Sequence, residues 1–343
     1  MKKEAKQILL LLNLAFFSIA LHAQDLHFSQ FYESPLTLNP ALCGQFNGSL
    51  LGEINYRTQW SSVMGASNGY NTMGATLELH NVLKYWTRGY LSQGLSFFSD
   101  RSGDAQIGTT QVSYTTACGI FLNSKSTLCS GLQIGLAQRS VNFQNMQWGE
   151  QYINGNYEAN APTGETGIGS DFEYFDFAGG VSYNYSSGLI DKTTNNDVKA
   201  NFGVSVFHVN QPNISYYGAN TPGSNLFIKY VFHGYLEYGI NKTPVSIVPG
   251  FVYYMQGPST ELDAGISAKY YMIRQVGNSG GTNKEANNFE LGIYYRMNDA
   301  VITTLSLKLK SYTMGISYDI NTSQLNEVSS GRGAFELSIK YIK

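Results

Sequence analysis

The feature that most constrains this chain is a period-two alternation of apolar and small or polar residues over segments of about ten residues. In the segment 311–320 every even position is apolar or aromatic, and every odd position is Ser, Thr, Gly or Asp. The same alternation recurs at 262–272 and 289–297. Because successive side chains of a strand point to opposite faces of a sheet, each segment predicts a strand with one apolar face and one polar face.

The number and length of these segments separate a membrane barrel from a soluble sandwich, whose half-buried strands also alternate. We count about fourteen segments, each close to the 9–11 residues that a tilted membrane strand needs. They start near residues 48, 70, 90, 107, 128, 173, 198, 226, 245, 262, 287, 302, 311 and 333. The sequence therefore predicts an all-β fold: a transmembrane antiparallel β-barrel of about 14 strands. The even number predicts that both ends lie on the periplasmic side.

Composition supports a chain with one face in lipid and one in water. Charged residues make up 13% of the sequence, about half the usual share in soluble domains. Aromatic residues make up 14%, which suits the aromatic girdles of a membrane barrel. The formal net charge of -2 gives no basic surface, so a nucleic-acid partner is excluded.

Residues 1–23 have the pattern of a secretory signal peptide. Lys2, Lys3 and Lys6 precede an apolar run at 8–20, which is followed by Ala23 at a cleavage position. The run is shorter than the roughly 20 apolar residues of a transmembrane helix, the alternative reading. We predict cleavage after Ala23, export, and a protein of the cell outer membrane whose barrel contacts lipid.

Two further regions follow from this division. Residues 24–47 precede the barrel of residues 48–343 and contain Asn39-Pro40, where the residue before proline is biased toward extended backbone. They are predicted to be an extended segment that forms either a plug or a periplasmic brace.

The connections between predicted strands differ in length in an ordered way. The connections 141–172, 210–225 and 321–332 are long and rich in Asn, Gly and Ser, and are predicted to be extracellular. Those at 123–126, 241–244 and 308–310 are tight and are predicted to be periplasmic turns. The connection 274–286 departs from this scheme, because it is long on the predicted inner side.

Three cysteines exclude a fully paired disulfide framework. Cys118 and Cys129 flank the predicted hairpin turn at 123–126. A bridge across this hairpin is one alternative, and two unpaired small residues on neighbouring strands is the other.

The small or polar faces of the strands carry charges of both signs, which are expected to point into the lumen. Mixed signs argue against a strongly ion-selective pore. Either these charges pair across the barrel or they line a substrate path. The candidates are Glu53, Arg57, Asp263, Lys269, Glu290, Arg296, Asp319, Glu336 and Lys340.

Catalytic and metal-binding signatures are absent from the sequence. The five His residues are scattered without metal-ligand spacing. There is no G-x-S-x-G elbow and no phosphate-binding loop. No enzymatic activity, metal or cofactor is predicted.

Four motifs in order along the chain resemble the PorP/SprF family of outer-membrane proteins from the type IX secretion and gliding machinery. They are Q-D-L-H-F-S-Q-F-Y running into N-P-A at 24–41, Y-R-T-Q-W at 56–60, F-H-V-N-Q-P at 207–212, and Y-D-I-N-T-S at 318–323 leading to G-R-G-A-F-E at 331–336. Cys43 and the non-aromatic end at Lys343 depart from the family pattern. The resemblance covers nearly all of the mature chain.

The resemblance implies positions with structural or partner-contact roles. Tyr56 and Trp60 suit an interfacial girdle, and the G-R-G stretch suits a tight entry into the last strand, with Arg332 facing either Asp319 or a partner. The candidates are Phe28, Ser29, Gln30, Asn39, Pro40, Tyr56, Arg57, Gln59, Trp60, His208, Asn210, Gln211, Pro212, Tyr318, Asp319, Asn321, Gly331, Arg332, Gly333, Phe335 and Glu336.

The resemblance also implies a function: a secretion-linked barrel that aids export or surface anchoring of a secreted, adhesin-like cargo protein. Its partners would be the cargo, bound by extracellular loops, and other type IX components. The alternative is a diffusion channel for small solutes, and an enzyme ranks third.

Overall fold

A computed structural model describes residues 25, 27–60, 69–83, 85–103, 105–142, 146–164, 171–187, 197–216, 223–272, 287–323 and 329–343. The predicted signal peptide and the whole of the long connection 274–286 lie outside these residues. Within the described part of the chain, no helix is both long and apolar enough to cross a bilayer.

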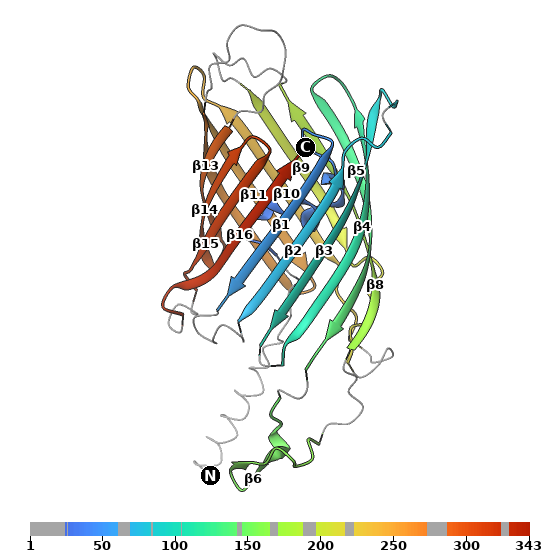
Figure 1. Ribbon diagram of the computed structural model, residues 1–343, viewed down its shortest axis with the longest axis vertical. Helices are drawn as coiled ribbons and strands as arrows, with labels where there is room; N and C mark the ends of the chain where they lie inside the picture. The colour runs from blue at the N-terminus through green and yellow to red at the C-terminus, as the bar shows by residue number, and fades with distance from the viewer. Residues whose placement is uncertain are drawn as a thin grey trace, which may run out of the picture.

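The chain forms a closed barrel of fourteen antiparallel strands, which confirms the predicted fold (Figure 1). Each strand pairs with its neighbours in sequence, and β1 closes the wall against β16 from Leu51↔Ile342 to Gln59↔Ala334. The strands are β1 (Leu50–Gln59), β2 (Tyr70–Leu79), β3 (Gly89–Ser102), β4 (Ile107–Phe121), β5 (Ser126–Ser140), β8 (Asp171–Ser186), β9 (Val198–Phe207), β10 (Lys229–Gly239), β11 (Val245–Gln256), β12 (Ser259–Met272), β13 (Asn287–Arg296), β14 (Ala300–Leu309), β15 (Tyr312–Asn321) and β16 (Arg332–Ile342).

The predicted strand starts agree with the observed ones to within a few residues. Alternation locates a strand well because its two faces meet different surroundings. Outward side chains such as Leu132 and Ile293 are 69% and 61% exposed, whereas the inward Asp263 and Glu336 are 1% and 2% exposed. An apolar outer wall is what a lipid-facing surface needs, since a charge at the bilayer midplane costs about 2–4 kcal/mol.

The two faces of the barrel, at either end of its axis, carry different connections. We call them the C-terminal face, where β1 begins and β16 ends, and the loop face (Figure 1). The connections between β5 and β8 and between β9 and β10, the two longest in the chain, lie on the loop face. The first of these carries a small hairpin, β6 (Tyr152–Ile153) with β7 (Asn156–Tyr157), which projects beyond the barrel.

Before β1, the chain lies inside the barrel as three short helical turns where an extended segment was expected. These are η1 (Phe31–Glu33), α2 (Pro35–Leu38) and η2 (Pro40–Leu42). The residue before the second proline, Asn39, does have extended backbone, with φ -160° and ψ 121°. We refer to residues 27–47 as the lumen segment.

The three cysteines are free, so of the two alternatives for Cys118 and Cys129 the structure shows the unpaired one. Gly119 lies opposite Cys129 and Cys118 lies opposite Ser130, so the two cysteines occupy neighbouring register positions. Cys129 is buried beside the Tyr90 hydroxyl, whereas Cys118 lies on the other face of its strand. Side chains on opposite faces of a sheet cannot meet without backbone movement.

The filled lumen as the candidate functional site

The lumen segment occupies the interior of the barrel and contacts all fourteen strands. At one side, Phe31 and Leu38 belong to an apolar cluster with Val231, Val252 and Ile302. The remaining strands meet the segment through hydrogen bonds, ion pairs or small apolar contacts. The candidate site is therefore a closed interface between the N-terminal segment and the barrel wall.

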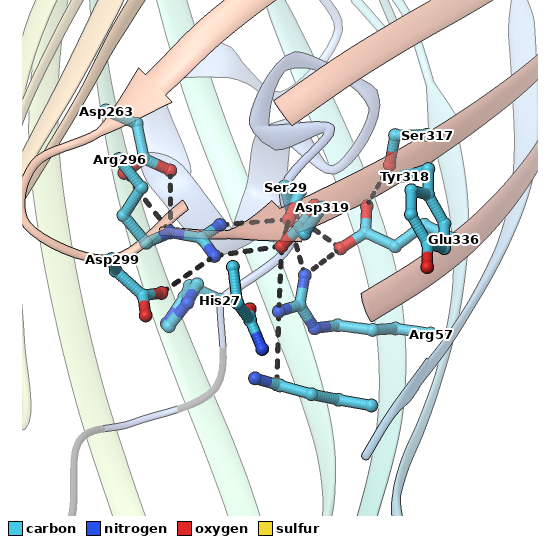
Figure 2. Close-up of polar contacts among 12 residues, drawn as sticks. His27, Ser29, Arg57, Asp263, Arg296, Asp299, Ser317, Tyr318, Asp319 and Glu336 are labelled. Atoms are coloured by element: carbon cyan, nitrogen blue, oxygen red, sulfur yellow. Dashed lines mark hydrogen bonds and ion pairs between the residues drawn. The ribbon is translucent and has the colours of Figure 1, made fainter. Parts of the chain in front are cut away.

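The first half of this interface is a charged cluster around Ser29, shown in Figure 2, formed by Ser29, Arg57, Asp263, Arg296, Asp319 and Glu336. The Ser29 hydroxyl donates to Asp319 at 2.7 Å and accepts from both Arg57 at 2.5 Å and Arg296 at 2.9 Å. We call this group the Ser29 cluster. Its side chains come from β1, β12, β13, β15 and β16, so it joins strands on both sides of the closing seam.

Glu336 is the point where the backbone of the lumen segment meets the cluster. The backbone N–H of Ser29 donates to one carboxylate oxygen of Glu336 at 2.6 Å, and that of Gln30 donates to the other at 2.9 Å. Arg57 makes a short ion pair with the same carboxylate. Charge-assisted bonds of this kind are roughly twice as strong as neutral ones.

Arg296 completes the cluster from the other side. Its guanidinium lies 2.9 Å from Asp319 and 3.3 Å from Asp263, with side chains that are 3%, 2% and 1% exposed. Buried ions are stable only when paired and hydrogen-bonded, and removing one partner leaves an uncompensated charge. The two arginines and the Ser29 hydroxyl are therefore a single interdependent unit.

The second half of the interface is held by close packing of Asn39 and Pro40 against the barrel wall. Asn39 donates from its side-chain amide to the carbonyl oxygens of Val181 and Val204, at 3.0 and 3.3 Å, and its own amide oxygen accepts from the Ala41 N–H at 2.9 Å. A Cβ added at Gly180 would lie 2.1 Å from Asn39 Oδ1. One at Gly131, opposite Gly180 in the sheet, would lie 2.3 Å from the Pro40 carbonyl carbon.

Gly131 and Gly180 give the N-P-A motif at residues 39–41 a physical role. The amide of Asn39 reaches strand carbonyls only because the neighbouring residues of β5 and β8 have no side chain. The sequence contained no signal linking Gly131 or Gly180 to Asn39, because they are far apart along the chain. Both glycines, like His233 beside Asn39, were missed as site residues.

Two further charge groups lie nearer the C-terminal face. Lys340 pairs with Glu33 at 2.6 Å and with Glu53 at 3.4 Å, so it joins the lumen segment to β1 and β16. Lys269 pairs with Glu290 at 3.1 Å and Glu237 at 3.3 Å. Of these residues, Glu33 and Glu237 were not among the sequence candidates, although each pairs with a candidate, Lys340 and Lys269 respectively.

At the loop face, His208 lies between two carboxylates. Its Nδ1 is 2.9 Å from Asp176, and its Nε2 makes a short contact with Asp25. Burial lowers the pKa of His208, but the charges and hydrogen bonds of Asp25 and Asp176 outweigh it and raise the pKa to about 9. For Asp25, burial by itself raises the pKa. The charge and hydrogen bond of His208 outweigh this effect and hold the pKa of Asp25 below its usual range.

The other family-motif residues have local structural contacts. Asn210 bonds to the backbone of Phe175 and Phe177 and thereby ties the F-H-V-N-Q-P stretch to β8. The Gln211 N–H closes a turn onto the His208 carbonyl oxygen, and the Pro212 carbonyl oxygen accepts from the Leu226 N–H. The Asn321 side-chain amide donates hydrogen bonds to the Ser329 hydroxyl and to the Arg332 carbonyl oxygen.

The aromatic motif residues Tyr56, Tyr318 and Phe335 point outward and are 42%, 39% and 39% exposed. Trp60 packs edge-on against Tyr70, with ring centroids 5.1 Å apart. The alternative in which Arg332 faces Asp319 is wrong, because Arg332 is exposed and Asp319 is held by Arg57 and Arg296.

The remaining motif residues pack tightly. Phe28 is buried near Gly74, and Gln30 accepts from Ser338. Gln59 accepts from Arg57. Gly331 has φ +78°, and a Cβ on Gly333 would lie 2.5 Å from the Asp319 carbonyl oxygen, so the G-R-G stretch allows the entry into β16.

Among the residues that the structure describes, no group of three or more His, Cys, Asp or Glu side chains is arranged to hold a metal ion. The clustered carboxylates are instead engaged by arginine and lysine.

The comparison of sequences identifies the class of protein. Residues 20–341 match the family described as "Type IX secretion system membrane protein PorP/SprF", so the chain belongs to this family. It is thus an outer-membrane β-barrel of the type IX secretion system. No curated protein matches the sequence.

Solved barrels resemble the fold only distantly. A deletion mutant of the TodX monoaromatic hydrocarbon channel has a TM-score of 0.46 at 10% identity, covering 90% of this chain and 93% of that one. The P. putida toluene transporter TodX has a TM-score of 0.43 at 9% identity, covering 88% and 92%. BamA from Haemophilus ducreyi has a TM-score of 0.40 at 9% identity, covering 86% and 70%. Likeness at this level carries no functional information.

Proposed function

We propose that this barrel serves the type IX secretion and gliding machinery by aiding export or surface anchoring of a secreted, adhesin-like cargo protein, without catalysis. Cargo would dock on the connections of the loop face, and other type IX components would contact the barrel. Membership of the PorP/SprF family supports this role.

The single observation that carries the proposal is that the lumen is filled by the chain itself. The segment contacts every strand and engages charges of the wall, with the Ser29 and Gln30 N–H groups bonded to Glu336 and Glu33 paired with Lys340. A diffusion pore needs a continuous water-filled path through the lumen, and the segment occupies that space. A rigid barrel with a filled interior is better suited to present loops, which are where recognition residues concentrate.

The test is cargo display on intact cells. Removing the gene should abolish surface display of the cargo, and the full-length barrel supplied in trans should restore it. Replacing residues 146–164 by a short Gly/Ser linker should reduce display, whereas replacing the turn 122–125 on the other face should not. Unchanged display in the deletion strain would refute the cargo role.

Co-purification tests the partner half of the proposal. Tagged barrel isolated from native membranes should carry the cargo and other type IX proteins with it. The variant lacking 146–164 should lose the cargo but keep the other components if the loop face binds cargo alone.

The alternative, a diffusion channel, has one observation in its favour, the polar inner wall. A channel would give large steady currents in planar bilayers. On our proposal the intact protein conducts little, and conductance appears only when residues 27–44 are removed. Large currents from the intact protein would favour the channel.

A further inference from the structure

Together with Asp25, which precedes it, the lumen segment extends from one face of the barrel to the other. At the loop face, the Asp25 backbone N–H donates to Gln256 at 3.1 Å, and its carboxylate contacts His208 and lies 3.9 Å from Lys229. His208 follows β9, Lys229 begins β10 and Gln256 ends β11, so all three mark that face.

The other end of the segment lies at the C-terminal face. The Gly44 N–H donates to Glu78 at 2.6 Å, near the end of β2, and its carbonyl oxygen lies 2.7 Å from His80 Nδ1. The Ser49 hydroxyl then donates to the carbonyl oxygen of Lys343. Between these ends, Ser29 and Asn39 contact the barrel wall, so the chain runs inside the barrel from the loop face to the C-terminal face.

The lengths of the connections say which face is outside the cell. Bacterial barrels have short periplasmic turns and longer extracellular loops. The two longest connections, between β5 and β8 and between β9 and β10, both lie on the loop face with Asp25. Tight turns at Asn241–Pro244 and at Lys310-Ser311 lie on the C-terminal face.

We infer that the chain crosses the outer membrane through its own lumen, so that its mature N-terminus lies among the extracellular loops while its C-terminus lies in the periplasm. The even number of strands places both ends of the barrel wall on one side, but the lumen segment reverses the side for the N-terminus. This inference rests on the barrel and its orientation and not on the cargo role.

The path is stable because the segment's polar groups find partners inside. Backbone N–H groups of Ser29, Gln30, Ala41 and Gly44 each bond to a buried side chain. A buried N–H without a partner costs about 1–3 kcal/mol, so these bonds fix the segment. The residues beside Asp25 then become part of the surface that the long loops offer to a partner, the same surface that the proposed function uses.

Cysteine labelling on intact cells tests the inference directly. In a Cys118→Ala background, Asp25→Cys reports on the N-terminus, with side chain 24% exposed in the native protein. Asn154→Cys, on the exposed tip of the β6–β7 hairpin, marks the loop face, and Asn123→Cys marks the C-terminal face. We expect a membrane-impermeant maleimide to label the first two on intact cells, and the third only after the outer membrane is permeabilised.

Two results would overturn the inference. In the first, Asp25→Cys is labelled only after permeabilisation, like Asn123→Cys. In the second, Asn154→Cys is labelled only after permeabilisation. Because the Asp25→Cys change removes the contact with His208, an epitope inserted between Gln24 and Asp25 provides a second readout that keeps Asp25. Antibody should bind it on intact cells, and should bind the same epitope after Lys343 only in permeabilised ones. Cargo display measured in these cells reports separately on the proposed function.

Discussion

The two halves of the lumen segment are held in the barrel by different physical means. Residues 28–34 are held mainly by ions, through the Ser29 cluster and the Lys340–Glu33 pair, and Phe31 adds apolar packing. Residues 35–44 lie mainly against β2–β5 and β8–β10 and are held mainly by close fit, with Asn39 and Pro40 packed over Gly180 and Gly131. Charge pairing tolerates small displacements, but steric fit does not, so the two halves should respond differently to substitution.

Arg296→Ala should have the largest effect, because it leaves the carboxylates of Asp263 and Asp319 buried without a full counter-charge. We expect a loss of about 3–5 kcal/mol in the free energy of unfolding. Urea unfolding of the barrel in detergent, followed by its shift in gel mobility, measures the loss. Arg332→Ala removes an exposed arginine and is the matched control, expected within about 0.5 kcal/mol of the native protein. Equal losses for both variants would contradict the ionic half of the comparison.

Gly180→Ala tests the half held by fit, and Gly179→Ala is its neighbour on the same strand. The new methyl at 180 would meet Asn39 Oδ1 at 2.1 Å, whereas that at 179 would meet Leu132 at an ordinary 3.4 Å. Overpacking of this kind costs about 1–3 kcal/mol. The same urea assay should show this loss at 180 and little change at 179. Hydrogen exchange should also show residues 35–44 opening first.

The contact of Asp25 with His208 makes the loop-face end of the segment sensitive to pH. The folded pKa of His208 is raised from 6.5 to about 9, so its stabilisation is complete below pH 6.5 and is lost as pH rises through about 9. The lowered pKa of Asp25 acts in the opposite range, present above its ordinary value of 3.8 and lost in stronger acid.

We therefore expect hydrogen exchange at residues 27–30, corrected for its intrinsic pH dependence, to speed up several-fold between pH 6 and pH 9.5. Exchange at residues 39–43 should not depend on pH in this way, because the Asn39 side chain bonds to backbone groups and not to a histidine–carboxylate ion pair. His208→Asn should remove the pH dependence. A response of the same size at residues 39–43 would show that the two halves are not held independently.

Cys43→Ala should have the smallest effect. Cys43 is fully buried with Leu36 and Ala117, and trimming it removes one sulfur from a small apolar contact. We expect a loss of about 1 kcal/mol in the same unfolding assay. Cys118→Ala on the outer wall should change the free energy of unfolding less. A larger loss at Cys118 than at Cys43 would contradict the expectation that lumen contacts stabilise the barrel more than the outer wall does.

Much of the fold could be predicted from the sequence because alternation is a local signal. The face of each strand is fixed by residues two apart, so the outward Tyr312, Met314 and Ile316 were assigned to lipid without knowledge of their neighbours. The inward charges were identified by the same rule, and the family motifs came from short runs of residues. None of these inferences needs residues far apart in the chain to be placed together.

The sequence by itself therefore determined the barrel, its strand count and which side chains point inward. Only the tertiary structure decided what those side chains meet: Ser29 with Glu336, Asn39 with Val181, and Asp25 with His208. It also separated Cys118 from Cys129, turned Arg332 outward and sent the lumen segment through the barrel. These outcomes depend on closure of the sheet, because only a closed wall brings distant strands around one segment.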